Sequence, residues 1–413
     1  MIKHNNIIEL LKGVKVEFLP LWEVTTWDKK FNAVDNYKQK NIIKYNYLLA
    51  NKLKMLVSNN GNVKLLTTNT TDLWTTEDLA GERVSEGEIV AIPWGGNVNV
   101  QYYKGKFLTA DNRIATSNNQ DLLNNKYLYY FLLKNVELLN SFYRGSGIKH
   151  PNMAQILDLL IPIPPIQLQT EIVRILDTFT ELTAELTAEL TARKKQYNYY
   201  RDKLLTFKED EVEWKALGDI SEKIYSGGTP KTDIAKYWEN GTIPWMSSGE
   251  VNLTTVYKTE KFISETGLRN SSAKFVPKNS VVIALAGQGK TRGKVARTRI
   301  DLTTNQSLAS LTFDENKVNS DYIFHFLNTQ YENLRQISSG NGARGGLNLQ
   351  MISSYKVPIP SLKEQDRIVK ILDKFEALTN SLTEGLPREI ELRQKQYEYY
   401  RNLLLNFPKV EDK

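Results

Sequence analysis

The amino-acid sequence predicts an α/β (α+β) protein in which two pseudo-symmetric small α/β domains are separated by a pair of long antiparallel coiled-coil helices. Three observations predict this: a length of 413 residues, an internal repeat with a period near 196 residues, and a stretch of about 40 residues without Gly or Pro. A chain of this length can form two or three domains, each with its own core. The predicted segments are a first α/β domain with an N-terminal helix (1–165), a first connector helix (166–209), a second α/β domain (210–361), and second connector helices with a C-terminal tail (362–413).

The repeat is clearest in two pairs of segments. Residues 172–183 (IVRILDTFTELT) match residues 368–379 (IVKILDKFEALT) at eight of twelve positions, and residues 196–207 (QYNYYRDKLLTF) match residues 396–407 (QYEYYRNLLLNF) equally well. Shorter landmarks precede them: 16–18 (VEF) with 212–214 (VEW), 145–147 (GSG) with 340–342 (GNG), and 162–164 with 358–360 (both PIP). This period is far longer than that of a solenoid and indicates a duplicated domain plus connector. Because the halves diverge between landmarks, one scaffold is expected to carry two different surfaces.

The first connector is predicted to be one long helix. No Gly or Pro occurs from Gln167 to Phe207, and apolar residues recur there at steps of three and four. This spacing indicates a helix of about 40 residues, or ~60 Å at 1.5 Å per residue. The tetrapeptide Thr-Ala-Glu-Leu is repeated over residues 183–190. Since these residues suit helices, extra copies are expected to lengthen the helix without breaking it.

The second connector has a matching apolar stripe from Ile368 to Leu382, so antiparallel pairing of the two connectors is the simplest arrangement. The offset between the copies grows from 196 to 200, and Gly385 and Pro387 fall within the extra residues. We expect a helix break there, with Pro387 in the first turn of a restarted helix.

Tyrosines cluster at equivalent ends of the connectors. Such clusters usually serve packing, although docking of partner helices is the alternative. The candidate partner-docking residues are Tyr197, Tyr200, Tyr397 and Tyr400.

Composition narrows the function classes. Lys and Arg outnumber Asp and Glu by 54 to 47, for a formal charge of +7, which is compatible with a polyanionic partner. The chain has no Cys and only three scattered His, so no metal site is expected. It contains no 18-residue apolar run and no signal-peptide core, so we expect a cytoplasmic protein without a membrane partner.

Residues 284–291 (ALAGQGKT) follow a strand-like segment and resemble a phosphate-cradling loop. However, Ala284 replaces the first glycine of that motif, and a basic stretch without acidic residues follows instead of an amphipathic helix. The sequence therefore favours a basic hairpin that faces phosphates, with a nucleotide-binding enzyme as the alternative.

The corresponding stretch of the first half, residues 94–113, mixes cations with amides and tyrosines. Guanidinium and amide groups can form paired hydrogen bonds with base edges, and cations bind the backbone. A solvated hairpin is the commoner fate of such a stretch, but its presence in both halves favours nucleic-acid binding. The glycine-containing loops 144–149 and 340–346 are further candidates, because backbone N–H groups beside cations can hold a phosphate.

Several of these motifs resemble the specificity subunits of type I restriction-modification systems. The second half carries 227–230 (GGTP), 237–238 (YW), 243–245 (IPW) and 357–360 (VPIP), followed by Glu364-Gln365. The Thr-Ala-Glu-Leu repeats followed by 193–197 (RKKQY) resemble the length-variable spacer of this family. The first half departs from the pattern: it has Leu168-Gln169 in the connector and lacks the GGTP and IPW motifs.

The resemblance implies a subunit that has no catalytic residues and binds no cofactor directly. Its two target-recognition domains would read the halves of a bipartite, asymmetric site in double-stranded DNA. The helices would set the gap and dock two methyltransferase subunits that bind S-adenosylmethionine, and two restriction (translocase) subunits using ATP and Mg would complete the complex. A tandem scaffold that only joins interaction domains is the remaining alternative.

Most candidate DNA-binding residues come from these basic and glycine-containing segments, and Lys231 and Ser247 lie beside the GGTP and IPW motifs. The candidates are Asn97, Gln101, Lys104, Lys106, Arg113, Arg144, Lys149, Lys231, Ser247, Gln288, Lys290, Arg292, Lys294, Arg297 and Arg344.

Overall fold

A computed structural model describes residues 4–208, 210–287, 291–338, 346–381 and 384–408. The chain forms two compact units: residues 1–186 with 389–413, and residues 187–388. Each unit is therefore built from one α/β domain and two helical segments. Among the described residues, no helix combines the length and apolar character needed to cross a membrane.

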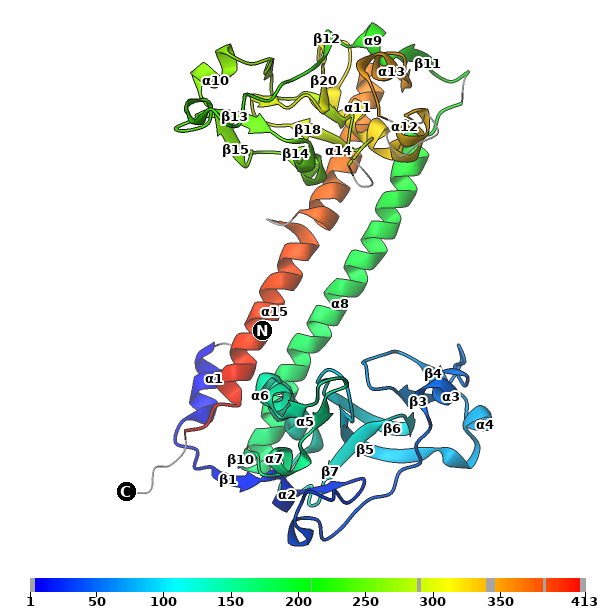
Figure 1. The fold of residues 1–413 in the computed structure, drawn as a ribbon. Coiled ribbons are helices and arrows are strands. Elements are labelled where there is room, and N and C mark those ends of the chain that lie inside the picture. Colours follow the sequence, from blue (N-terminus) through cyan, green and yellow to red (C-terminus); the bar gives the residue numbers. More distant parts are fainter. Residues whose placement is uncertain (1–3, 209, 288–290, 339–345, 382–383, 409–413) are drawn as a thin grey trace. The chain divides into compact units, whose positions relative to one another are not determined.

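The first unit contains a six-stranded sheet and the helices that cover it (Figure 1). Its elements up to the sheet centre are α1 (His4–Leu11), β1 (Glu17–Pro20), α2 (Leu21–Val24), β2 (Thr25–Trp27), η1 (Asn36–Lys38), α3 (Ala50–Lys54), β3 (Val63–Leu66), β4 (Trp74–Thr75), α4 (Glu77–Ala80), η2 (Gly81–Arg83) and β5 (Ser85–Pro93). They continue with β6 (Gln101–Thr109), β7 (Asn112–Ser117), α5 (Asn125–Lys134), α6 (Val136–Ser141), β8 (Tyr143–Arg144), β9 (His150–Pro151), α7 (Met153–Leu157) and β10 (Leu160–Ile163).

The second unit contains a five-stranded and a four-stranded sheet. Its elements begin with β11 (Glu213–Ala216), α9 (Leu217–Ile220), β12 (Lys223–Ser226), η3 (Ala235–Tyr237), β13 (Ile243–Met246), η4 (Ser248–Leu253), β14 (Thr255–Val256), β15 (Lys261–Ile263), α10 (Glu265–Arg269), β16 (Phe275–Val276) and β17 (Val281–Ala284). They continue with β18 (Val295–Thr298), β19 (Leu302–Thr304), β20 (Leu308–Thr312), α11 (Ser320–Thr329), α12 (Tyr331–Ile337), α13 (Leu349–Ser353), β21 (Lys356–Ile359) and α14 (Leu362–Asn380).

The main sheets of the two units share one topology. The strand order is β2-β7-β5-β6-β3-β4 in the first unit and β12-β20-β17-β18-β14 in the second. In both, the central strand (β5 or β17) pairs antiparallel with both neighbours, whereas the outer strand β3 or β14 is parallel to its neighbour. The duplication therefore extends through the regions where the sequences have diverged. The second unit adds the sheet β15-β13-β19-β16.

A two-stranded ribbon leads from each domain into its connector. Phe18 of β1 pairs with Pro162 of β10, and Trp214 of β11 pairs with Pro358 of β21 in the same register. Each ribbon thus joins the repeated VEF or VEW segment to the PIP segment, and it explains why these short landmarks recur together.

The predicted long helix is confirmed as α8 (Ile166–Leu205), a single helix of 40 residues that contains the Thr-Ala-Glu-Leu repeats. The predicted break is also confirmed, because α14 ends at Asn380 and α15 (Gly385–Leu404) places Pro387 in its first turn. Gly385 has a φ of +77°, and a Cβ there would lie 2.4 Å from the carbonyl oxygen of Ala377. Only glycine fits this restart without moving the backbone.

The connectors contribute to the cores of both units. In the first unit, Ile172 and Leu176 of α8 are buried with Leu404 near the end of α15. In the second, Leu205 of α8 is buried with Ile368 and Leu372 of α14. Each helical segment thus buries its apolar stripe against the α/β domain of its unit and against a connector segment from the other copy.

Candidate nucleic-acid interface

In the first domain, two loops that the sequence predicted to bind DNA lie against each other. One joins β5 to β6 and the other joins β8 to β9. The backbone N–H of Gly96 donates to the carbonyl oxygen of Lys149 at 3.0 Å, and Nδ1 of His150 lies 2.8 Å from the carbonyl oxygen of Trp94. The structure therefore brings together segments that are about 50 residues apart in the sequence.

These two loops and their flanks carry exposed polar and basic side chains. Asn97, Arg144 and Lys149 are exposed, and Arg144 donates to the side chain of Gln155 at 3.1 Å. Arg113 lies beneath them, with its guanidinium 3.8 Å from the ring centroid of Trp94. These four of the predicted residues therefore belong to one region.

Arg113 also lines a hollow of about 630 Å³. Burial lowers the pKa of its guanidinium and raises the pKa of neighbouring Asp28. The Nε of Arg113 has no hydrogen-bond partner among the described residues, although the residue is only 7% exposed. Tyr47 and Lys44 line the same hollow. The carboxylates of Asp28 and Asp111 line it too, so the buried donor beside aromatic side chains suits a planar polar group and not an anion.

Three other predicted residues lie along β6 and are engaged within the domain. Gln101 is buried and donates to the carbonyl oxygen of Thr67 at 2.8 Å. Lys104 pairs with Glu88 at 3.1 Å, and Lys106 pairs with a carboxylate of α4 at 2.8 Å. Their role in DNA binding remains a prediction, but their present partners are internal.

In the second domain, the structure rejects the nucleotide-binding loop. A phosphate-cradling loop leads into a helix whose N-terminus binds the phosphates. Here β17 ends at Ala284, and the chain returns as β18, with Ile283 paired antiparallel to Val295. The stretch is thus the predicted basic hairpin. Gln288, Lys290 and Arg344 lie outside the described residues.

The loops of the second domain repeat the arrangement of the first. The backbone N–H of Leu347, in the segment ahead of α13, donates to the carbonyl oxygen of Leu285 at 3.0 Å. The turn after the central strand therefore again contacts the segment that precedes the connector. Lys294 donates to Asn252 at 2.6 Å, and Arg292 is partly buried in the same turn.

The two remaining predicted DNA-binding residues of this domain, Ser247 and Lys231, lie beside the IPW and GGTP motifs and not in the hairpin. Ser247 caps η4 in a reciprocal capping box with Glu250, and Lys231 is exposed just after the GGTP motif. In that motif, a Cβ at Gly227 would lie 1.9 Å from the carbonyl oxygen of Thr304. The glycines are therefore required for close backbone packing, and Lys231 is the residue there that is available to a ligand.

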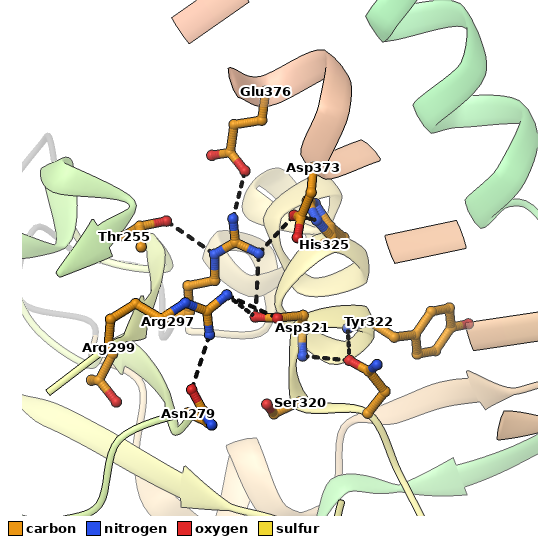
Figure 2. Close-up of polar contacts among 12 residues, drawn as sticks. Thr255, Asn279, Arg297, Arg299, Ser320, Asp321, Tyr322, His325, Asp373 and Glu376 are labelled. Carbon is orange, nitrogen blue, oxygen red and sulfur yellow. Dashed lines mark hydrogen bonds and ion pairs between the residues drawn. The ribbon is translucent and has the colours of Figure 1, made fainter. Parts of the chain in front are cut away.

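Arg297 occupies a different environment from the other predicted cations. It is 6% exposed, and its Nη1 and Nη2 lie 2.8 Å from Asp373 and 2.9 Å from Glu376, both on α14 (Figure 2). Its Nε donates to Thr255 at 2.9 Å, and Nη1 lies 3.2 Å from Asp321. We therefore reassign Arg297 from the predicted DNA contacts to an internal joint between β18 and α14.

His325 completes this joint. Its Nε2 lies 2.8 Å from the Asp373 carboxylate. Ligand atoms of His325, Asp373 and Glu376 lie within 4.8 Å of one another, but the cation among them is the Arg297 guanidinium. Burial disfavours ionisation of Asp373, yet the hydrogen bond from His325 and the charge of Arg297 outweigh it and hold the Asp373 pKa at about 2.

The first unit contains the equivalent joint with different chemistry. Asp177 occupies the repeat position of Asp373 and accepts from Lys126 at 2.8 Å and from the Tyr130 hydroxyl at 2.6 Å. Tyr130 corresponds to His325, and Lys126 corresponds to Asp321, in the equivalent helices α5 and α11. The carboxylate on the connector is thus the feature that both joints share.

A buried glutamine reinforces each joint. Gln169 accepts from the backbone N–H of Asn124 at 2.9 Å and donates to the carbonyl oxygen of Pro164 at 2.8 Å. Gln365 makes the same two contacts, with Asn319 at 2.9 Å and Pro360 at 2.8 Å. Sequence reasoning missed this role, although both glutamines stood within the repeat.

The tyrosine clusters serve packing between connector segments. Phe179 stacks on Tyr400 in the first unit, with ring centroids 5.3 Å apart, and Phe375 stacks on Tyr200 in the second, at 5.7 Å. Tyr197 also contacts Phe375, and Tyr397 packs against the core of the first unit. Packing, the favoured alternative, therefore accounts for these residues, and their docking of partner subunits remains a prediction.

Comparison with known proteins decides the family. A family model described as the type I restriction modification DNA specificity domain matches residues 31–193 and again residues 209–392. The chain belongs to this family. It carries two of the family's domains and is a type I restriction-modification specificity subunit with two target-recognition domains.

Relatives of this specificity subunit cover nearly its whole length. It is 39% identical to the EcoR124I/EcoR124II specificity subunit of Escherichia coli over 98% of this chain and 97% of that protein. It is 34% identical to a putative type I specificity subunit of Haemophilus influenzae, over 97% of each chain. Its fold is similar to that of the crystallised type I S subunit from M. genitalium, with a TM-score of 0.61, 16% identity, and coverage of 97% and 98%.

Proposed function

We propose that the two target-recognition domains read the two halves of a bipartite, asymmetric site in double-stranded DNA. The observation that carries this proposal is the pair of contacting loops found in both domains: Gly96 with Lys149 in the first, and Leu285 with Leu347 in the second. The scaffold beneath these loops is duplicated, whereas the side chains on them differ. Unlike loops on like scaffolds are expected to read unlike half-sites.

In the first domain, the proposed DNA-facing residues are Asn97, Arg144, Lys149 and the Arg113–Trp94 pair. Exposed cations bind phosphates without sequence preference, whereas an amide or a guanidinium held at a fixed position can read a base edge. In the second domain, the corresponding group is Lys231 and the turn between β17 and β18, which includes Arg292 and Lys294.

The chain is proposed to recognise DNA without catalysing a reaction. Two methyltransferase subunits, with S-adenosylmethionine bound to them, would dock on the connectors, and two restriction subunits would supply the ATP- and Mg-dependent steps. Cytoplasmic location stays an expectation from the sequence.

The connector α8 is proposed to set the gap between half-sites. Deleting Thr187–Leu190 would shorten a helix by ~6 Å and turn its face by roughly 40°. The preferred gap is expected to shrink by at most about two base pairs at 3.4 Å each, while both half-site sequences stay the same.

Methylome sequencing of cells that carry this chain with its methyltransferase partners tests the proposal. We expect one modified motif with two unlike half-sites and a fixed gap. Lys149→Ala is expected to weaken DNA binding by the assembled complex and to reduce its salt dependence, because one phosphate contact is lost. Lys317→Ala is the matched control, since Lys317 is an exposed lysine outside the connectors and the reading loops and pairs with Asp314 at 3.1 Å. Modification without a bipartite motif would refute the proposal.

A further inference from the structure

The joints between each domain and its connector supply an inference about specificity. In the second unit, the Arg297 guanidinium connects β14 through Thr255 to α14 through Asp373 and Glu376 (Figure 2). Arg299 extends the network, since it lies 2.8 Å from both oxygens of Asp321. Two strands and two helices therefore converge on one cluster around the buried Arg297.

This cluster is close to the proposed DNA-facing turn. Lys294 lies immediately before β18, and Arg297 follows it by three residues, which corresponds to about 10 Å at 3.3 Å per residue. A strand held at one end by several ion pairs has little freedom at the other. The contacts at Asp373 therefore restrain the turn that carries Arg292 and Lys294.

The first unit places an equivalent group on the equivalent strand. Tyr102 of β6 pairs with Val90, as Arg297 of β18 pairs with Val281, and both positions lie three residues before the end of the central strand. Lys126 lies over the Tyr102 ring at 5.2 Å and binds Asp177 at 2.8 Å.

The strand residue rests on the same helix position in both units. The ring of Tyr102 lies 5.9 Å from that of Tyr129, and the guanidinium of Arg297 lies 4.7 Å from the ring of Phe324. The side chains that link the strand to the connector carboxylate differ between the two units, but the link itself is present in both. This indicates that the position of the strand relative to the connector is what is needed.

We propose that Asp177 and Asp373 are positioning residues for DNA recognition, each fixing the orientation of its own domain on the connector and hence the placement of that domain's reading loops. Neither residue is proposed to touch DNA. This inference rests on the proposed function, because it explains how the subunit discriminates between half-site sequences and between gap lengths.

Asp177→Asn and Asp373→Asn test the proposal in the full chain assembled with its methyltransferase partners. Binding is measured to DNA with the wild-type motif, to DNA with one base changed in either half-site, and to DNA with the gap altered by one base pair. Each variant is expected to lose discrimination about tenfold at one half-site only, the two variants affecting opposite half-sites. Discrimination against the altered gap is expected to fall in both.

Two further variants keep the result interpretable. Glu213→Gln removes an exposed acid of β11, off the connectors, that pairs locally with Lys215 at 3.1 Å, and is expected to match the wild type. Glu376→Gln removes one contact of Arg297 and is expected to act like Asp373→Asn but more weakly, so it serves if Asp373→Asn does not fold.

The outcomes separate the inference from the proposed function. If the wild-type complex shows no bipartite preference, the proposed function fails. If the wild type discriminates and the folded Asp variants discriminate equally well, the positioning role is refuted. A uniform loss of affinity on all DNAs, with discrimination unchanged, also overturns it, because a merely structural role predicts that result.

Discussion

Replacement of Gln365 by Ala tests whether the buried glutamines hold each domain to its connector. Gln365 is 1% exposed and bridges the N-terminus of α11 to the strand before α14, through Asn319 and Pro360. Truncation leaves one backbone N–H and one carbonyl oxygen without their partner. At about 1–3 kcal/mol for each of these two buried polar groups left unpaired, the local cost is about 2–6 kcal/mol.

Hydrogen exchange measured by mass spectrometry on the full chain is the suitable assay, because a chain of two units need not unfold in one step. A local loss of about 2–6 kcal/mol corresponds to about 30- to 25,000-fold faster exchange of the amides in the first turn of α11. Gln169→Ala is expected to have a somewhat larger effect in α5, since Gln169 also donates to Leu122 at 2.8 Å.

Gln350→Ala provides the matched control. Gln350 is exposed on α13 and contacts only a neighbouring turn, so its loss is expected to stay within about 0.5 kcal/mol. If exchange at the start of α11 in Gln365→Ala stays within about threefold of that in the control, the glutamine bridge contributes less than about 1 kcal/mol and the reasoning is refuted.

Three further predictions concern the break, the glycine motif and acid stability. Gly385→Ala should lower the free energy of unfolding by about 1–2 kcal/mol and so reduce the urea midpoint, because φ is +77° and the Cβ would lie 2.4 Å from the Ala377 carbonyl; an unchanged midpoint contradicts this. Gly227→Ala should lower the free energy of unfolding more than Gly385→Ala does, since its Cβ would lie 1.9 Å from the Thr304 carbonyl oxygen; equal urea midpoints of the two variants would disprove this ranking. The folded-state pKa of Asp373 is about 2, below the ordinary 3.8, so its stabilisation is present above pH 3.8 and lost as pH falls through about 2. After discounting for the partial exposure of Asp373, this contribution to the free energy of unfolding is about 1 kcal/mol. The loss of stability on acid titration should be smaller by this amount in Asp373→Asn.

The candidate site was only partly predictable. The basic hairpin and the glycine-containing loops could be recognised, because residues that bind phosphates are grouped along the chain. Arg297 could not be told apart from its neighbours, since its partners Asp373 and Glu376 are more than 70 residues away. A cation on a strand looks the same in sequence whether it faces DNA or a carboxylate of its own domain's connector.

The sequence by itself determined the duplication, the long helix α8 and the break before Gly385. These features follow from local rules: repeated residues, apolar spacing, and the backbone preferences of Gly and Pro, none of which needs distant contacts. Only the tertiary structure decided that Phe179 stacks on Tyr400 and Phe375 on Tyr200, so that each unit borrows a helical segment from the other copy. Such pairings depend on which surfaces meet after folding, and a periodic stripe specifies that a face is buried but not what buries it.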